Sequence, residues 1–337
     1  MLLRQIFLLS MCLLLVTVIN AQDAKDIESR YATFSKHKKF FAKDKWAMVK
    51  FQIIYKLTTA KVTKAMDKND YIKSKSSSGS YGILEGITEE DLQNITDQVA
   101  ENFIRRMKEE AGVEVITWGS FADSPNTSKI KEKAEERELY SKSQGLGYAM
   151  SYDGTPYWNK VIQIVPGGKK LAKELGANNG MLSIYIDFAD TEAEASAFVS
   201  SKKGGGWITH RWSESADQNI TPIVRVKPNM GSQNAWEAAT SIGGTSVGGQ
   251  TELLHSWNIT YAGAEPDKLA SDVQFATKVE AFAGQLPTVL QNRSNNKIEY
   301  VKSFVVQTTP EKYGAAVMDA TNKYFDDVIG YYNLTKP

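Results

Sequence analysis

The sequence predicts an α+β protein with mixed, largely antiparallel sheets, helices packed on one face, and room for two subdomains. Apolar and polar residues alternate with period two in several segments, as in half-buried strands. Other segments place apolar residues three or four positions apart, as in amphipathic helices. The two kinds of segment do not follow a regular strand–helix–strand rhythm, which favours α+β over a doubly wound α/β sheet.

The first 21 residues have the layout of a secretory signal peptide, so we expect a mature chain that begins at Gln22. Arg4 supplies the positive charge, an apolar run covers residues 6–19, and Ala21 is a small residue suited to cleavage. Cleavage removes Cys12, the single cysteine of the chain, and this excludes disulfides and cysteine nucleophiles from the mature protein. Residues 22–45 are polar and rich in lysine, which indicates a solvated N-terminal arm.

Residues 46–190 are predicted to form an α/β domain. The strongest strand pattern lies at 47–57, and it places Ala47, Val49, Phe51, Ile53, Tyr55 and Leu57 on one face. Thr88 and Asp91 resemble a capping box, and the helix they begin ends at Gly112. A strand at 113–118, a charged helix at 129–142 and a helix ending at Gly176 follow. The domain closes with a strand that has Leu182, Ile184, Ile186 and Phe188 on one face. Two segments in this region are predicted loops, the Ser-rich 73–82 and the Gly- and Tyr-rich 143–158.

Residues 191–337 are predicted to be a strand-rich α+β region packed on the first domain. A segment at 220–227 contains Pro222, which places it at a sheet edge or a strand start. Further strands are predicted at 253–261 and 298–306, and a helix at 279–290. The last helix has Thr309 as its cap and Pro310 as its first residue, and it buries one apolar stripe.

Composition excludes several function classes. The chain has 40 basic and 39 acidic residues, a net charge of +1, so no basic excess is present for nucleic acid. After the signal peptide, no segment approaches the roughly 18 consecutive apolar residues of a membrane span. We therefore expect no nucleic-acid partner and no transmembrane helix in the mature chain.

No motif identifies a catalytic, cofactor or metal site. The three histidines, His37, His210 and His255, have no metal-binding spacing. The nucleophile-elbow motif of hydrolases is absent, although a catalytic triad assembled from distant positions would leave no such motif. An aromatic surface for glycan or peptide is the remaining candidate, with Trp207, Trp212, Trp236 and His210 as its residues.

The order of elements between Trp46 and Asp190 resembles a known group of envelope proteins. A strand (AMVKFQIIYKL), a helix (DLQNITDQVAENFIRRM), a strand (VEVITW) and a charged helix (SKIKEKAEER) lead to the phrase LGANNGMLSIYI. This resembles the periplasmic α/β domain of the curli-transport (CsgG-like) family, of the TolB N-terminal domain and of the lipoprotein activators of penicillin-binding proteins. The matching phrase has no catalytic residues to transfer. The resemblance implies a scaffold for binding or assembly.

These observations lead us to expect a secreted or periplasmic, non-enzymatic binding or assembly protein of the cell envelope, without a cofactor. Its partner would be an envelope protein or a cell-surface polymer, and oligomerisation is compatible with this role. Two alternatives remain open from the sequence. One is a secreted hydrolase with a dispersed Ser/Asp/Glu/His site, and the other is a carbohydrate- or peptide-binding module that uses exposed tryptophans.

Overall fold

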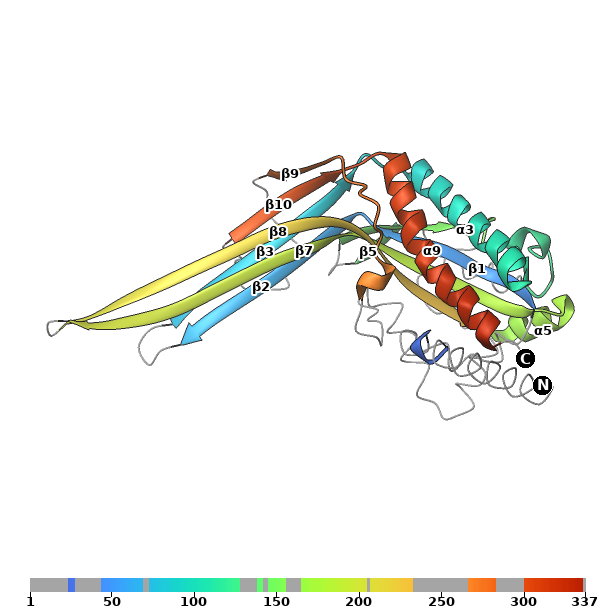
Figure 1. Ribbon diagram of the computed structural model, residues 1–337, viewed down its shortest axis with the longest axis horizontal. Helices are drawn as coiled ribbons and strands as arrows, with labels where there is room; N and C mark the ends of the chain where they lie inside the picture. Colours follow the sequence, from blue (N-terminus) through green and yellow to red (C-terminus); the bar gives the residue numbers. More distant parts are fainter. Residues whose placement is uncertain are drawn as a thin grey trace, which may run out of the picture.

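The protein is an α+β protein with two sheets and two long helices (Figure 1). The structure, a computed structural model, describes residues 24–27, 44–68, 73–127, 138–141, 145–155, 165–204, 207–232, 266–282 and 300–335. The molecule is elongated: the two helices cover one end of a long curved sheet, and paired strands extend away from them at the other end. No helix in the described part of the chain is long and apolar enough to cross a membrane.

The larger sheet has six strands, in the order β5-β6-β1-β7-β8 with β4 added to β1. Its strands are β1 (Lys45–Lys56), β4 (Glu114–Ile116), β5 (Glu138–Ser141), β6 (Gly145–Ser151), β7 (Asn178–Gly204) and β8 (Trp207–Ser232). Strand β1 runs parallel to β4 and β7, and the other pairs are antiparallel. Strand β7 continues without interruption past residue 190, so the two regions proposed from the sequence share this strand.

The smaller sheet has four strands, in the order β2-β3-β10-β9. Its strands are β2 (Thr58–Lys68), β3 (Lys73–Glu85), β9 (Lys278–Phe282) and β10 (Tyr300–Gln307). The chain passes from the larger sheet into the smaller one at Leu57, between β1 and β2. Only the β3–β10 pair of this sheet is parallel.

One continuous core joins both sheets to the helices α3 (Glu89–Ala111) and α9 (Pro310–Thr335). The apolar stripe predicted for α3 is buried in it: Leu92, Ile95, Val99, Phe103 and Met107. Strand β7 contributes the four residues predicted to share one face, and α9 contributes Tyr313, Val317, Ala320, Tyr324 and Val328. A smaller cluster lies where α5 (Val165–Leu175) and the 3-10 turn η2 (Trp118–Ser120) meet the start of β1.

The predicted ends of the long helices are confirmed. Thr88 caps α3 through its hydroxyl, which accepts from the Asp91 backbone N–H at 3.2 Å, while the Asp91 carboxylate accepts from the Thr88 N–H at 2.8 Å. Gly112 ends the helix in the left-handed conformation that glycine adopts readily, with φ 69°. Helix α9 begins at Pro310, as predicted from Thr309 and the proline.

The predicted face of β1 is wrong at its start, because a bulge changes the alternation. The pairing of β1 with β7 shifts register between Met48 and Lys50, so one residue is extra on β1. Ala47 and Val49 therefore pack in the smaller cluster, whereas Phe51, Ile53 and Tyr55 face the main core. The bulge lets one strand contribute to two cores on opposite faces of the sheet.

Four segments predicted to be loops or helices contain strands instead. The Ser-rich 73–82 lies in β3, where pairing with β2 and β10 on both edges outweighs the weak strand preference of serine and glycine. Residues 145–151 of the second predicted loop form β6 against β1. The predicted helix at 279–290 begins as β9, and its remainder lies outside the described residues. Residues 138–141 of the predicted charged helix form β5, and the strand predicted at 253–261 also lies outside the described part.

Candidate functional site

The structure brings three of the four proposed surface residues to one end of the β7–β8 hairpin. In the ladder, Trp207 pairs with Gly204, His210 with Ser201, and Trp212 with Val199. Because neighbouring positions of a strand alternate between its faces, positions 210 and 212 share one face and position 207 lies on the other. Trp236 lies outside the described residues.

This end of the hairpin projects beyond the helix-covered part of the molecule (Figure 1). The β1–β7 pairing runs only to Tyr55 and Ile186, whereas the β7–β8 pairing continues from Asp190 and Thr221 to Gly204 and Trp207. We call residues 190–221 the β7–β8 arm. Within the described residues, β8 is the only strand paired with β7 along the arm. The arm therefore has unpaired strand edges, which are the usual template for adding another strand.

The base of the arm is held by the smaller sheet. The Thr59 and Thr191 hydroxyls lie 3.4 Å apart, and the Ser80 hydroxyl donates to the Asn219 carbonyl at 3.1 Å. Ser80 is fully buried, and Gly82 lies directly against Ile220. Small residues on β3 thus let the two sheets approach closely, which fixes the direction in which the arm leaves the core.

A polar row crosses the sheet face opposite the two long helices. Gln52 on β1 is paired with Ser151 on β6, and both are buried. Among the described residues, neither amide atom of Gln52 nor the Ser151 hydroxyl has a hydrogen-bond partner, so this row has spare hydrogen-bonding capacity that water or a ligand could fill. Next to it, Lys56 pairs with Asp187 at 3.2 Å. The alternation predicted for residues 47–57 implies that Gln52 and Lys56 lie on the face opposite Phe51, but it does not predict that Gln52 is buried.

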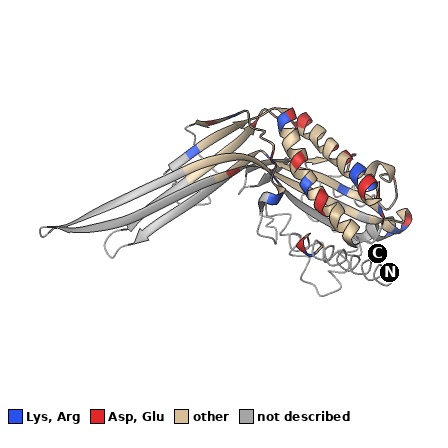
Figure 2. Cartoon of the chain, in the orientation of Figure 1, with Lys and Arg blue, Asp and Glu red and all other residues tan. Residues whose placement is uncertain are grey.

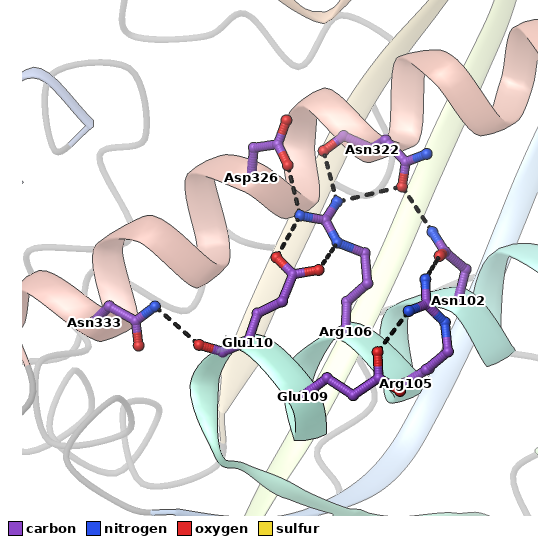
Figure 3. Close-up of polar contacts among 8 residues, drawn as sticks. All are labelled: Asn102, Arg105, Arg106, Glu109, Glu110, Asn322, Asp326 and Asn333. Atoms are coloured by element: carbon purple, nitrogen blue, oxygen red, sulfur yellow. Dashed lines mark hydrogen bonds and ion pairs between the residues drawn. The ribbon is translucent and has the colours of Figure 1, made fainter.

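A network of polar side chains joins α3 to α9 (Figure 3). The Arg106 guanidinium donates to both carboxylate oxygens of Glu110, at 2.6 and 2.8 Å, and to Asp326 of the other helix at 2.6 Å. It also reaches the Asn322 side chain at 3.3 Å, and Asn102 donates to the same oxygen at 2.7 Å. The hydrogen bonds from Arg106 lower the pKa of Glu110. Arg106 and Asn102 bind residues of α9, and Glu110 of α3 holds the Arg106 guanidinium in place, so this network joins the two helices.

Tyr55 and Tyr313 are two of the tyrosines that are fully buried in the main core. The Tyr55 hydroxyl lies 3.0 Å from that of Thr96, inside the main core. Burial raises the pKa of both Tyr55 and Tyr313 well above the ordinary value for tyrosine. Both side chains therefore stay neutral across the physiological range, and neither is suited to act as a base.

Charged residues of the two long helices are mixed in sign rather than gathered by sign. Figure 2 shows basic and acidic residues interspersed along α3 and α9. No group of three or more His, Asp or Glu side chains suited to a metal occurs in the part of the chain that the structure describes. His210 is the one histidine in that part, since His37 and His255 lie outside it.

Comparisons with protein-family models, with curated proteins and with solved structures found no match to this chain.

Proposed function

We propose that the protein is an exported, non-enzymatic binding or assembly protein of the cell envelope, and that the β7–β8 arm contacts its partner. The observation that carries the proposal is the arm itself. It is a long two-stranded ribbon that leaves a well-packed base and keeps its edges unpaired within the described residues.

Physical chemistry supports a binding role for such a ribbon. Isolated two-stranded hairpins are marginally stable in water, and soluble proteins usually protect long strand edges. Strands β2 and β3 of the smaller sheet lie alongside the part of the arm nearer the core. A partner that pairs with the arm's edges or covers its far end would supply the contacts that the smaller sheet does not. Trp207 and Trp212 belong to the side-chain types that contribute most at interfaces, and they lie near the end of the ribbon.

Two features of the sequence support the same proposal. A signal peptide over the first 21 residues would direct the chain to the envelope or beyond it, where we propose an envelope protein or a cell-surface polymer as the partner. The resemblance to the CsgG-like and TolB N-terminal group implies a scaffold for assembly or binding. Neither feature names the partner.

Shortening the arm tests the proposal. Residues 197–214 are removed and Ser196 is joined to Ser215 through an Asn-Gly turn, because these two positions are paired in the ladder. We expect the shortened protein to melt within a few degrees of the parent, since the core residues described above lie outside the deleted segment 197–214. We also expect it to lose the partners that the parent retains from envelope extracts, as measured by quantitative mass spectrometry of parallel pull-downs.

A double variant separates aromatic recognition from backbone pairing. Trp207→Ser with Trp212→Ser keeps the ribbon but removes its indole rings. Loss of capture in this variant assigns the contact to the aromatic residues, and retention assigns it to the strand edges. Capture that is unchanged after the arm is shortened would refute the proposal. Loss of an enzymatic activity in His210→Gln at unchanged stability would favour the hydrolase instead.

A further inference from the structure

The exposed large apolar side chains of the described residues gather in one short stretch. They are Val273, Val279 and Phe282, with exposed fractions of 38%, 42% and 40%. All three lie between residues 273 and 282, the segment that leads into β9 and forms it. Every residue of β9 is exposed. A strand with no buried side chain gains little from packing within its own chain.

Strand β9 also lies at the edge of the smaller sheet. It pairs with β10 from Lys278 opposite Gln307 to Phe282 opposite Ser303, and β10 is its one strand partner within the described residues. The other edge of β9 presents backbone N–H and C=O groups that can pair with a further strand. Exposed apolar side chains and an open edge therefore coincide at β9, away from the β7–β8 arm.

We propose that β9 pairs with β9 of a second copy of this chain, antiparallel and across a two-fold axis at Val279. In that register Val279 lies opposite the partner's Val279, and Lys278 lies opposite the partner's Glu280. The two charges are neighbours on β9 and already form an ion pair with each other. Two opposite-charge cross-strand pairs then form at the interface, one on each side of the axis.

The charge pattern selects this register over the next one. An axis at Glu280 would place two glutamates opposite each other, and like charges at directly opposed positions are destabilising. A two-fold interface must be complementary to itself, and the sequence KVEAF satisfies this condition about Val279. The result is one sheet that continues from β2 of one copy through both β9 strands to β2 of the other.

Charge reversal tests the proposal in the full exported chain. We expect the parent to dimerise reversibly in sedimentation-velocity experiments over a range of concentrations. Lys278→Glu or Glu280→Lys alone makes both cross-strand pairs repulsive, and we expect the dissociation constant to rise about tenfold. The double variant Lys278→Glu/Glu280→Lys restores opposite charges in the same register, and we expect it to dimerise like the parent. A parent that stays monomeric, or single reversals without effect, would overturn the proposal.

A cysteine at the axis gives an independent readout. In a chain with Cys12→Ser, Val279→Cys introduces the sole cysteine, and two such residues would face each other across the axis. We expect mild oxidation to give a disulfide-linked dimer on non-reducing gels. Val273→Cys is the matched control, because it is similarly exposed but lies outside β9. Equal cross-linking of both variants would refute the proposed axis. Shortening the β7–β8 arm leaves β9 intact, so the shortened protein should still dimerise. Failure of the proposed dimer and failure of the proposed partner binding by the arm can therefore be told apart.

Discussion

Gly82 shows how one residue sets the distance between the two sheets. A Cβ atom at this position would lie 2.3 Å from Ile220 Cδ1, which is shorter than packed atoms tolerate, and 3.0 Å from Thr59 Cγ2, which is a tight contact. We expect Gly82→Ala to lower the free energy of unfolding by about 1–3 kcal/mol, the usual cost of overpacking. Chemical denaturation of the purified variant measures this change.

The control for Gly82→Ala is a matched pair of variants. Ile220→Val removes the Cδ1 atom that the new methyl group would meet, and alone it should cost about 0.5–1.5 kcal/mol. Combined with Gly82→Ala, it should recover part of the lost stability, so the two effects should not add. If the changes in unfolding free energy of the two single variants simply add in the double variant, the contact with Ile220 does not explain the cost of Gly82→Ala.

Ile184 is a second residue with a definite expected effect. It is fully buried in β7, opposite Ile53 of β1. We expect Ile184→Asp to prevent folding, because a carboxylate there would be buried among apolar side chains without a partner. The measurement is circular dichroism with thermal melting, and Gln274→Asp at an exposed loop position is the control. A melting curve like that of the parent would contradict the assigned core face.

At the scale of elements, Arg106 joins α3 to α9. Its side chain is 13% exposed and binds Glu110 and Asp326, so Arg106→Met leaves several acceptors without their donor. We expect a loss of about 1–2 kcal/mol in the free energy of unfolding. Arg105→Met is the control, because the Arg105–Glu109 pair is 57% exposed on each side and exposed pairs contribute little. Equal effects of the two substitutions would contradict this assignment.

The ion pair between Arg106 and Glu110 should also make the free energy of unfolding depend on pH. Arg106 lowers the pKa of Glu110 in the folded protein below its ordinary value. A lowered folded-state pKa contributes stability above the unfolded-state pKa, and this stability is lost as pH falls through the folded-state value. We therefore expect the difference in unfolding free energy between the parent and Arg106→Met to shrink as the pH is lowered through the acid range. A constant difference would show that Glu110 does not depend on Arg106.

Elements with strong local signals could be predicted, and elements defined by their neighbours could not. Both ends of α3 and the start of α9 follow from capping residues within one turn of the chain. Strand β3 has the composition of a loop and becomes a strand through its pairing with β2 and β10. The bulge in β1 depends on the register with β7, which no local pattern encodes. The apolar residues 279–290 fit a helix by spacing, but residues 278–282 form β9 against β10.

The candidate site could be predicted only in part, for the same reason. Composition identified Trp207, His210 and Trp212, but their position at the end of a projecting ribbon follows from the long-range pairing of β7 with β8. The open edge of β9 could not be foreseen, because the segment was assigned to a helix. Both proposed contacts depend on which strand edges remain unpaired, and that is a property of the whole sheet.

At the scale of the whole molecule, the core and the arm should differ in local stability. Strand β7 passes from the centre of the larger sheet, where Leu182, Ile184 and Ile186 are fully buried, into an arm paired only with β8 among the described strands. Exchange of hydrogen-bonded amides in the core requires global unfolding, whereas an open ribbon can separate locally. We expect hydrogen–deuterium exchange to be slowest at 182–188 and to become faster along β7 toward residue 204. Adding a partner that binds the arm should slow exchange there and leave the core unchanged. Uniform protection along β7 in the isolated protein would contradict the division into a stable base and an arm free to bind.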